Sequence, residues 1–481
     1  MSITLKKVFA VYVFALAFLF ASRPISDPDL WFHLAAGRFT VLNHGVPRID
    51  TFSCTNPGQT YVAHGWLSDI LLYLIYSRIG SSFLIFLFAL FTTIAFWLVY
   101  KRSSDYILVR GFAVLLGVWT VLPNIGVRPR IFTLLIFAVY FVILTECLRQ
   151  ARLKYLWWLV PLMVLWVNLH GGFLLGLTMI ALAIVGSFLD SHFAQESSDN
   201  APSRIGPLTL TLIACALAAL LNPYGVKIYS HILGVLSAPE FQDVIVDWLP
   251  PDFHQSEQLP LIILILGTVS VMSLSPKRVR PSELLFFLAT LYMTLKMQRN
   301  AMIFAIVASS LLADYGGPLW EAVFRSGKEQ PLWSRTGFPT AVLNVLLLVP
   351  LLLFGVKLKN LVYQPPTQQM AAVPLNATQF LKDKGLTGCT FTDPNTWGAY
   401  LIWAAPENPV YIDGRDMYPT AFVKEYVQII QGKKAWRGPF QQYGVNNVIL
   451  SQPSMLRSQL EESPVWQKVY EDDYSIVFSK R

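Results

Sequence analysis

Charged residues are scarce in this chain. Asp, Glu, Lys and Arg make up 14% of its 481 residues, whereas 54% of the residues are hydrophobic and the mean hydropathy is +0.48. Because an average soluble domain carries about 25% charged residues, this composition excludes an ordinary soluble globule and predicts an integral membrane protein. The net charge of +8 comes from Lys and Arg in short clusters between apolar runs, which excludes the continuous basic stripe of a nucleic-acid-binding protein.

Cysteine is scarce as well. The four cysteines show no close spacing of the kind that binds zinc. Cys147 and Cys215 lie inside apolar runs. Cys54 and Cys389 fall in segments that we predict below to be external, where a disulfide is chemically allowed. No distance between these two cysteines follows from the sequence, so their pairing stays open.

Long apolar runs, by contrast, are abundant. A helix needs about 20 apolar residues to cross the hydrocarbon core of a bilayer. The runs therefore predict a mainly α, polytopic bundle with about eleven transmembrane helices, the first of them uncleaved. The predicted spans are 8–21, 81–100, 107–122, 131–148, 155–169, 172–190, 207–221, 259–275, 282–296, 301–313 and 338–356.

Basic residues occupy alternate loops between these runs, among them Arg102 and Arg149. By the positive-inside rule these loops face the cytoplasm, together with the N-terminus. The other loops then face outward, and the long first external loop spans 22–65. We expect a transmembrane domain at 1–356 and an extracytoplasmic α/β domain at 357–481.

The C-terminal domain is predicted from a change of pattern, because short β-like runs alternate there with amphipathic helical stretches. The β-like runs are 389–392, 409–412, 445–450 and 474–478, and the helical stretches are 372–383, 420–430 and 455–462.

The first external loop begins with acidic residues. Asp27 and Asp29 are separated by one residue, and two such carboxylates can act as a general base with its electrostatic partner, or as ligands of Mg²⁺ or Mn²⁺. The alternative is structural, because Asp27 followed by Pro28 is a common N-cap and first-position pair of a helix. His33 and His64 of the same loop are candidates for moving protons or for hydrogen bonds to a sugar.

Polar residues also lie at the external ends of the predicted spans. Ionisable groups near hydrocarbon usually face a cavity or a partner, and the arginine fork binds phosphate bidentately. The alternative for the arginines is snorkelling to lipid headgroups. The candidates are Arg128, Arg130 and Arg299 for a donor phosphate, and Asn168, His170, Tyr224 and Asp247 for other substrate contacts.

Two further acidic segments complete the set of candidate residues. Asp243 and Asp247 lie in a later external loop, where either carboxylate can complete a cation site or orient a sugar hydroxyl. Asp413 and Arg415 follow a β-like run in the C-terminal domain, at the kind of strand edge where α/β sheets present ligands. For these two residues a salt bridge within a turn is at least as good an explanation.

The arrangement of an internal N-terminus, an acidic first external loop, about eleven spans and an external C-terminal domain resembles the GT-C class of membrane glycosyltransferases. The chain is also similar to a bacterial subgroup related to that class, which has Asp-Pro-Asp-Leu-Trp in the first external loop. The stretches that carry this resemblance are 27–33, 50–53, 64–67, 168–172, 222–225 and 413–415.

The resemblance implies an inverting glycosyltransferase of the bacterial inner membrane and cell envelope. Its donor would be a sugar on polyprenyl phosphate or diphosphate, and its acceptor a glycan, a lipid or a protein at the outer face. Asp27 or Asp29 would be the base. Mg²⁺ or Mn²⁺ would be the cofactor if the enzyme depends on a metal, with Asp27, Asp29 and Asp247 as ligands.

Two other functions fit the sequence less well. One is a transporter or flippase for a polyprenyl-linked or other anionic substrate, and the other is a non-catalytic scaffold for glycan assembly. Transporters place their ionisable residues near the bilayer midplane and often contain internal repeats. Here the polar residues lie at the external ends of the spans, and we find no repeat in the sequence.

Overall fold

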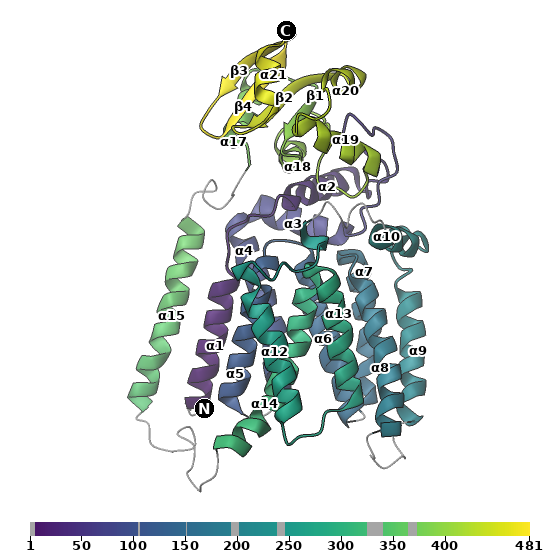
Figure 1. Ribbon diagram of the computed structural model, residues 1–481, viewed down its shortest axis with the longest axis vertical. Coiled ribbons are helices and arrows are strands. Elements are labelled where there is room, and N and C mark those ends of the chain that lie inside the picture. The colour runs from purple at the N-terminus through teal and green to yellow at the C-terminus, as the bar shows by residue number, and fades with distance from the viewer. Residues whose placement is uncertain are drawn as a thin grey trace. The chain divides into compact units, whose positions relative to one another are not determined.

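The computed structural model consists mainly of helices and divides into two compact units (Figure 1). It describes residues 5–103, 106–150, 152–193, 202–237, 246–324, 340–363 and 373–481. Unit 1 comprises Met1–Arg23, Ile85–Val226 and Gln242–Gln364, and unit 2 comprises Pro24–Leu84, Lys227–Phe241 and Pro365–Arg481.

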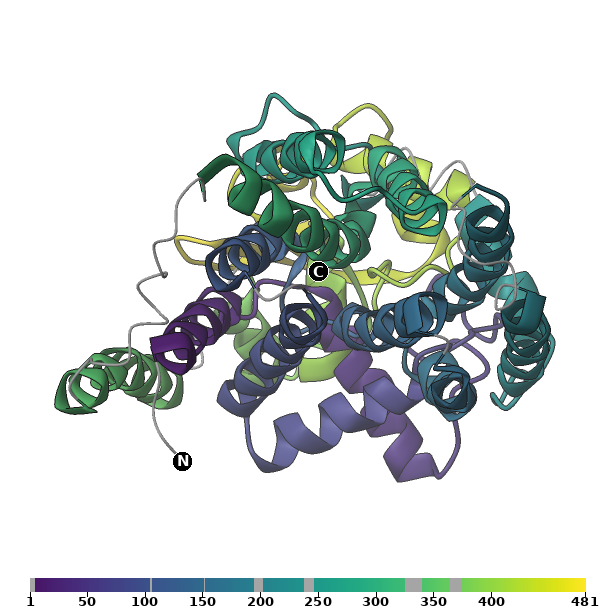
Figure 2. The same cartoon turned by 90° about the horizontal axis from the view of Figure 1, so that it is seen from below.

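Unit 1 is a helical bundle. Its helices are α1 (Leu5–Ala21), most of α4 (Ser81–Arg102), α5 (Ile107–Val121), α6 (Arg130–Gln150), α7 (Leu159–Leu169), α8 (Phe173–Phe193), α9 (Pro202–Ala218), α12 (Leu259–Leu274), α13 (Pro281–Lys296), α14 (Ala301–Phe324) and α15 (Thr340–Tyr363). Short 3-10 turns adjoin some of them: η1 (Leu122–Asn124), η2 (Leu153–Trp158), η3 (Val246–Trp248), η4 (Ser256–Gln258) and η5 (Gln298–Asn300). Seen end-on, α15 lies at the edge of the bundle beside α1 (Figure 2).

Helix α14 forms the centre of this bundle. Every residue of α14 from Ala301 to Gly317 is buried, because α5, α12 and α13 pack around it. A helix that is apolar on all sides is stable only when it is surrounded in this way or by lipid. The sequence alone marked 301–313 as a short run, and the helix continues well beyond it to Phe324.

Each of the eleven predicted spans contains a helix in the structure. In the described ranges, six helical stretches are long and apolar enough to cross a membrane, namely Ser81–Arg102, Ile107–Asn124, Arg130–Gln150, Phe173–Phe193, Ser256–Leu274 and Gln298–Phe324. The chain is therefore a membrane protein, whereas the total of about eleven spans stays a prediction.

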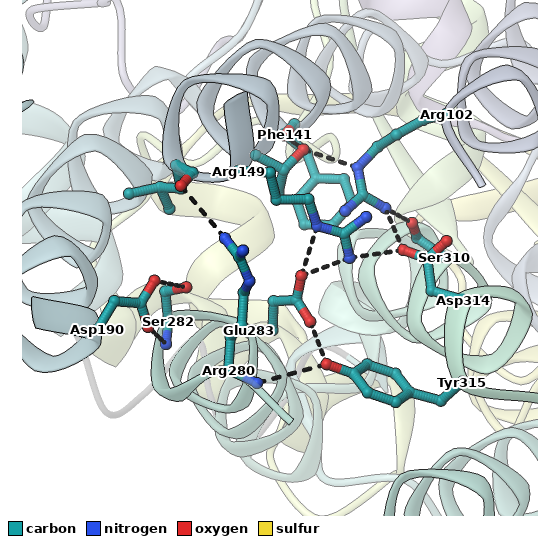
Figure 3. A network of polar contacts seen from close by, with 12 residues as sticks. Arg102, Phe141, Arg149, Asp190, Arg280, Ser282, Glu283, Ser310, Asp314 and Tyr315 are labelled. Atoms are coloured by element: carbon teal, nitrogen blue, oxygen red, sulfur yellow. Dashed lines mark hydrogen bonds and ion pairs between the residues drawn. The ribbon is translucent and has the colours of Figure 1, made fainter. Parts of the chain in front are cut away.

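Charged side chains from four helices of the bundle meet in one network of polar contacts (Figure 3). Arg149, in the last turn of α6, donates to Glu283 Oε1 at 2.6 Å and to Asp314 Oδ2 at 2.7 Å. Arg102, at the end of α4, also reaches Asp314 Oδ2, at 3.1 Å. Tyr315 donates to Glu283 Oε2 at 2.5 Å. Two guanidiniums and two carboxylates thus neutralise one another and connect α4, α6, α13 and α14.

Unit 2 is an α/β unit built around a four-stranded sheet. Its strands are β1 (Cys389–Asp393), β2 (Val445–Ser451), β3 (Trp466–Glu471) and β4 (Ser475–Lys480), in the order β1-β2-β4-β3. Strands β1 and β2 are parallel and the other two pairs are antiparallel. The helices of unit 2 are α2 (Asp29–Asn43), α3 (Trp66–Arg78), α10 (Lys227–Ser237), α17 (Leu375–Asp383), α18 (Thr396–Ala404), α19 (Thr420–Ile430), α20 (Arg437–Gln442) and α21 (Leu456–Glu461).

Three of the four predicted strands are present, and the strand at 409–412 is a wrong prediction. Val410 makes only isolated bridges, to Ser53 and to Thr390. Pro409 has no N–H to donate, and Gly414 soon ends the extended stretch, so no ladder forms there. Strand β3 was not predicted from the sequence, because its side chains are mostly exposed and polar, as in an edge strand.

The first external loop belongs to the same unit as the C-terminal domain. Helix α2 packs against α3 and α18, and a disulfide joins Cys54 to Cys389. Gly37 allows α2 and α3 to approach closely, since a Cβ at this position would lie 2.1 Å from the backbone oxygen of Asp69. Segments far apart in sequence thus form one scaffold for the polar residues described next.

Candidate functional site

The two acidic residues of the first external loop lie at the start of α2. Asp27 Oδ1 accepts a hydrogen bond from the backbone N–H of Asp29 at 3.0 Å, and helix α2 begins at Asp29. Trp31 is buried in the first turn of α2 and packs edge-on against Tyr400 of α18, with ring centroids 4.9 Å apart. Asp27 therefore helps to close the first turn, while the buried Trp31 fixes the direction in which Asp29 is presented.

Asp29 faces the loop that contains Gly414. A Cβ at Gly414 would lie only 2.9 Å from Asp29 Oδ1, so a larger residue would displace this carboxylate. The sequence marked both segments as candidates. The structure shows that they meet within unit 2.

Arg415 holds this loop in place. Its guanidinium donates to Asp413 through Nε at 2.9 Å and through Nη2 at 2.7 Å, and it donates to Asp50 Oδ1 at 2.9 Å. The hydroxyl of Tyr418 adds a bond to Asp413 at 2.9 Å. Although burial opposes it, the Asp413 carboxylate raises the pKa of Arg415 well above its usual value. Asp413 and Arg415, both predicted as external-domain candidates, thus form a buried ion pair that shapes the loop.

Three histidines of unit 2 have carboxylates nearby. His33 Nδ1 lies 2.6 Å from Asp69 Oδ1, on the next helix. His64 lies beside His231 of α10, with ring centroids 5.8 Å apart, and His231 Nε2 lies 3.7 Å from Asp416 Oδ2. Burial lowers the pKa of His64, although the Asp416 carboxylate opposes this effect. The lowered pKa favours a neutral imidazole at His64.

The predicted phosphate-binding residues lie in unit 1, where two of them share one carboxylate. Arg128 and Arg130 each donate to Asp247 Oδ2 at 2.8 Å. Burial by itself would raise the pKa of Asp247, but Arg130 and Arg128 hold it below its usual value. Arg299 stacks over the neighbouring Trp248, 4.8 Å from the ring centroid, and adds to the positive potential at Arg128. This group of Arg128, Arg130, Arg299 and Asp247 contains more positive than negative charge, which suits an anionic ligand.

The amide candidates of unit 1 tie two turns together. Asn222 Nδ2 donates to Asn168 Oδ1 at 3.2 Å, and Asn222 Oδ1 accepts from the backbone N–H of Tyr224 at 3.0 Å. His170 Nδ1 accepts from the backbone N–H of Gly172 at 3.0 Å, so this nitrogen is unprotonated and Nε2 carries the hydrogen. These contacts show how the residues are held in place, and their contact with substrate stays a prediction.

The three predicted metal ligands do not form a cluster in either unit. Asp27 and Asp29 belong to unit 2 and Asp247 to unit 1. Two arginines already occupy one oxygen of Asp247, and a carboxylate that is neutralised in this way is a poor ligand for Mg²⁺. Asp243 lies outside the described residues. Metal binding by these residues stays a prediction, and no step proposed below depends on it.

Four residues near the candidates were missed from the sequence: Asp50, Asp69, His231 and Asp416. Asp50 begins the stretch 50–53 and Asp416 directly follows the stretch 413–415, so their places in these motifs were usable signals. His231 had none, because it is a single histidine on an amphipathic helix more than 150 residues away from His64.

No family model matches the chain, and a search of curated proteins found no match. Solved structures do match it. ArnT from Cupriavidus metallidurans superimposes with a TM-score of 0.54 at 11% identity, over 98% of this chain and 97% of ArnT. The oligosaccharyltransferase AglB from Archaeoglobus fulgidus matches with a TM-score of 0.53 at 12% identity, over 93% of this chain and 70% of AglB.

The arabinofuranosyltransferase AftD from Mycobacteria matches with a TM-score of 0.55 at 14% identity. The alignment covers 99% of this chain but only 42% of AftD, so the chain spans less than half of that protein. All three are membrane glycosyltransferases of the GT-C class. At such low identity the likeness concerns the fold, and this chain has the GT-C fold that its sequence pattern predicts.

Proposed function

We propose that this protein is a membrane glycosyltransferase that moves a sugar from a polyprenyl phosphate or diphosphate to an acceptor on the outer face of the bacterial inner membrane. The observation that carries the proposal is the likeness in fold to ArnT and AglB over almost the whole chain. ArnT has been solved with undecaprenyl phosphate and AglB with dolichol-phosphate. The disulfide between Cys54 and Cys389 supports an external location of unit 2, since such bonds persist in oxidising compartments.

The base in the proposed reaction is Asp29. Asp27 is engaged at the first turn of α2, whereas Asp29 is presented towards the loop at Gly414. The Asp29 carboxylate takes the proton of the acceptor hydroxyl while the hydroxyl oxygen attacks the anomeric carbon. The new bond from oxygen to the anomeric carbon forms as the bond from that carbon to the donor phosphate breaks. Attack from the face opposite the phosphate inverts the configuration, and the lipid phosphate leaves with the electron pair.

The donor phosphate is assigned to Arg128, Arg130 and Arg299. Arg128 and Arg130 both contact Asp247, and Arg299 stacks on Trp248, so unit 1 gathers three guanidinium forks of the kind that binds phosphate. Their burial strengthens this attraction, because charges interact more strongly where water is excluded. As the bond to the sugar breaks, the same guanidiniums stabilise the negative charge that develops on the leaving phosphate.

The proposal is tested with purified full-length protein and a series of radiolabelled polyprenyl-phosphate sugars. Wild-type protein should release free lipid phosphate in an acceptor-dependent reaction. Asp29→Asn keeps the shape of the side chain but removes the base, so we expect a decrease in rate of about 10²-fold or more. Asp383→Asn is the matched control, because Asp383 is exposed on α17, and this variant should retain the wild-type rate.

The other functions give different results in the same assay. A transporter or flippase would move the lipid-linked sugar without release of lipid phosphate. A scaffold would show neither activity, and its Asp27→Asn and Asp29→Asn variants would complement a deletion of the gene fully. Either result overturns the enzyme proposal.

A further inference from the structure

His64, His231 and Asp416 bring their side chains together from three separate segments of unit 2. His64 precedes α3, His231 lies in the first half of α10, and Asp416 follows the loop at Gly414. One ligand atom of each lies within 4.8 Å of the other two. Two imidazoles and a carboxylate at this spacing form a set of metal-binding groups, and we propose that they bind one divalent transition-metal ion of the Zn²⁺ class.

The distances suit an ion of this class. Zn²⁺ bonds of about 2.0–2.2 Å at tetrahedral angles place neighbouring ligand atoms roughly 3.4 Å apart. His231 Nε2 and Asp416 Oδ2 are already 3.7 Å apart. The rings of His64 and His231 are inclined at 39° rather than stacked flat, so small rotations of the two side chains bring their nitrogens towards a common point.

The polar contacts of His231 also indicate a ligand. Its Nε2 atom is buried and makes no hydrogen bond to the residues that the structure describes. The 3.7 Å separation from Asp416 is too long for a hydrogen bond. A buried nitrogen without a hydrogen bond is unfavourable, since its desolvation is not compensated. A metal ion between His231 and Asp416 satisfies both groups at once.

The surrounding structure holds the three ligands in place, as outer contacts do in metal sites. Asp416 is the neighbour of Arg415, which is fixed by its bonds to Asp413 and Asp50. Helix α10 is anchored through the buried residues Ile228 and Ile232, on either side of His231 in sequence.

The chemistry of the ligands selects the ion. Imidazole suits Zn²⁺ and other transition metals, whereas Mg²⁺ and Ca²⁺ require oxygen ligands. Three protein ligands leave a coordination position open for water, as in catalytic rather than purely structural zinc sites. His231 and Asp416 are 20% and 28% exposed, so the ion can enter from solvent. This site differs in its residues and in its ion from the Mg²⁺ or Mn²⁺ site predicted at Asp27, Asp29 and Asp247.

The experiment measures metal binding by the full-length protein in detergent, without any assay of transferase activity. Protein stripped with EDTA is titrated with Zn²⁺ by calorimetry, and bound metal is counted by mass spectrometry after dialysis. We expect one equivalent of Zn²⁺, which a large excess of Mg²⁺ does not displace. With Co²⁺ in place of Zn²⁺, visible absorption bands should report nitrogen and oxygen ligands.

Variants assign the site. His231→Asn and Asp416→Asn should each weaken Zn²⁺ binding by on the order of 100-fold, because loss of even an outer contact weakens metal binding 10- to 100-fold. His44→Asn is the matched control: His44 is exposed and has φ of 49°, a backbone conformation that Asn tolerates. The His44→Asn variant should bind one equivalent of Zn²⁺, as we expect for the wild type.

Two results overturn the proposal. One is a wild-type protein that binds no Zn²⁺ after EDTA treatment. The other is unchanged binding in both His231→Asn and Asp416→Asn, with thermal unfolding showing that these variants are folded. The experiment measures bound metal and not transferase activity. A negative result for the metal site therefore leaves the transferase proposal untouched, and the reverse also holds.

Discussion

The position of the Asp29 carboxylate depends on the smallest residue of the opposing loop. Gly414 leaves room for Asp29 Oδ1, and no other residue type lacks the Cβ that would come within 2.9 Å of this atom. The atom that would have to move is the end of a flexible side chain rather than backbone. A substitution at Gly414 should therefore change the position of the proposed base more than it changes the stability of unit 2.

We predict that Gly414→Ala reduces transferase activity while the protein remains folded. Displacement of a reacting group by about 1 Å can decrease the rate by about 10²-fold. The measurement is the rate of lipid phosphate release, compared with the melting temperature of the same preparation. The loss should appear mainly in kcat, since the donor phosphate is assigned to arginines of unit 1.

Gly438→Ala is the control for this substitution. Gly438 also belongs to unit 2, and a Cβ there would have no atom within 4 Å. Its activity should match the wild type. If Gly414→Ala is fully active, the Asp29 carboxylate is not the base, or its position does not matter for the reaction.

The sequence predicted some of these residues and not others. Asp27, Asp29 and Asp413 stand in short motifs with other polar residues, so local pattern was enough to select them. His231 lies on an amphipathic helix outside any quoted motif, and Asp69 follows the stretch 64–67, but neither position shows from the sequence which residue it contacts. Their importance follows only from contacts with His64 and His33.

The helices of unit 1 are joined near one end by buried charges rather than by apolar packing alone. Arg149 contacts both Glu283 of α13 and Asp314 of α14, and its side chain is only 19% exposed. The basic neighbours of Arg149 in the sequence predict that it lies in a cytoplasmic loop. The structure adds that its guanidinium is engaged inside the protein.

We predict that Arg149→Met destabilises the bundle strongly. Removing one partner of a buried ion network leaves the Glu283 and Asp314 carboxylates partly uncompensated, which costs about 3–5 kcal/mol. The measurement is the midpoint of unfolding in SDS from mixed micelles. Arg152→Met is the matched control, because Arg152 is 50% exposed and its pair with Glu146 is worth about 0–1 kcal/mol. Equal midpoints for the two variants would contradict the structural role of Arg149.

Helices were predicted correctly from the sequence where a segment is apolar enough to form a helix in any membrane environment. All eleven apolar runs are helical, and α19 has the bounds that its amphipathic pattern predicts. Prediction failed for α3, α10, α18, α20 and β3, which were not recognised as elements. These elements are short or partly exposed, so their packing partners decide their conformation more than their own sequence does.

A disulfide links the first and last segments of unit 2. The disulfide joins Cys54 to Cys389 across 335 residues of sequence, and this interval contains almost the whole helical bundle. A disulfide stabilises a fold mainly by restricting the unfolded chain, with a larger effect for longer loops.

We predict that reduction with TCEP lowers the melting temperature of the wild-type protein, since loss of a native disulfide costs about 2–5 kcal/mol. Cys54→Ser/Cys389→Ser should melt at the lower temperature with or without TCEP. Cys147→Ala/Cys215→Ala is the control, because those two cysteines are free thiols and the effect of TCEP should persist. A wild-type protein that is insensitive to TCEP, although its disulfide is shown to be reduced, would contradict the prediction.

The sequence by itself determined that this protein lies in a lipid bilayer, and it determined the class of the fold. Scarce charge and long apolar runs require a bilayer, because unpaired polar groups and charges are unfavourable in hydrocarbon. The acidic first loop and the change of pattern near residue 367 pointed to the GT-C arrangement, which the solved structures share. These features are local, so composition and periodicity are enough to reveal them.

The tertiary structure alone decided which distant residues meet. The bond from Cys54 to Cys389, the cluster of His64, His231 and Asp416, and the placement of the first external loop in the same unit as the C-terminal domain all join segments at least 150 residues apart. No local pattern encodes such contacts, because they depend on how helices and strands pack after they have formed. The proposed base and the proposed metal site both depend on that packing.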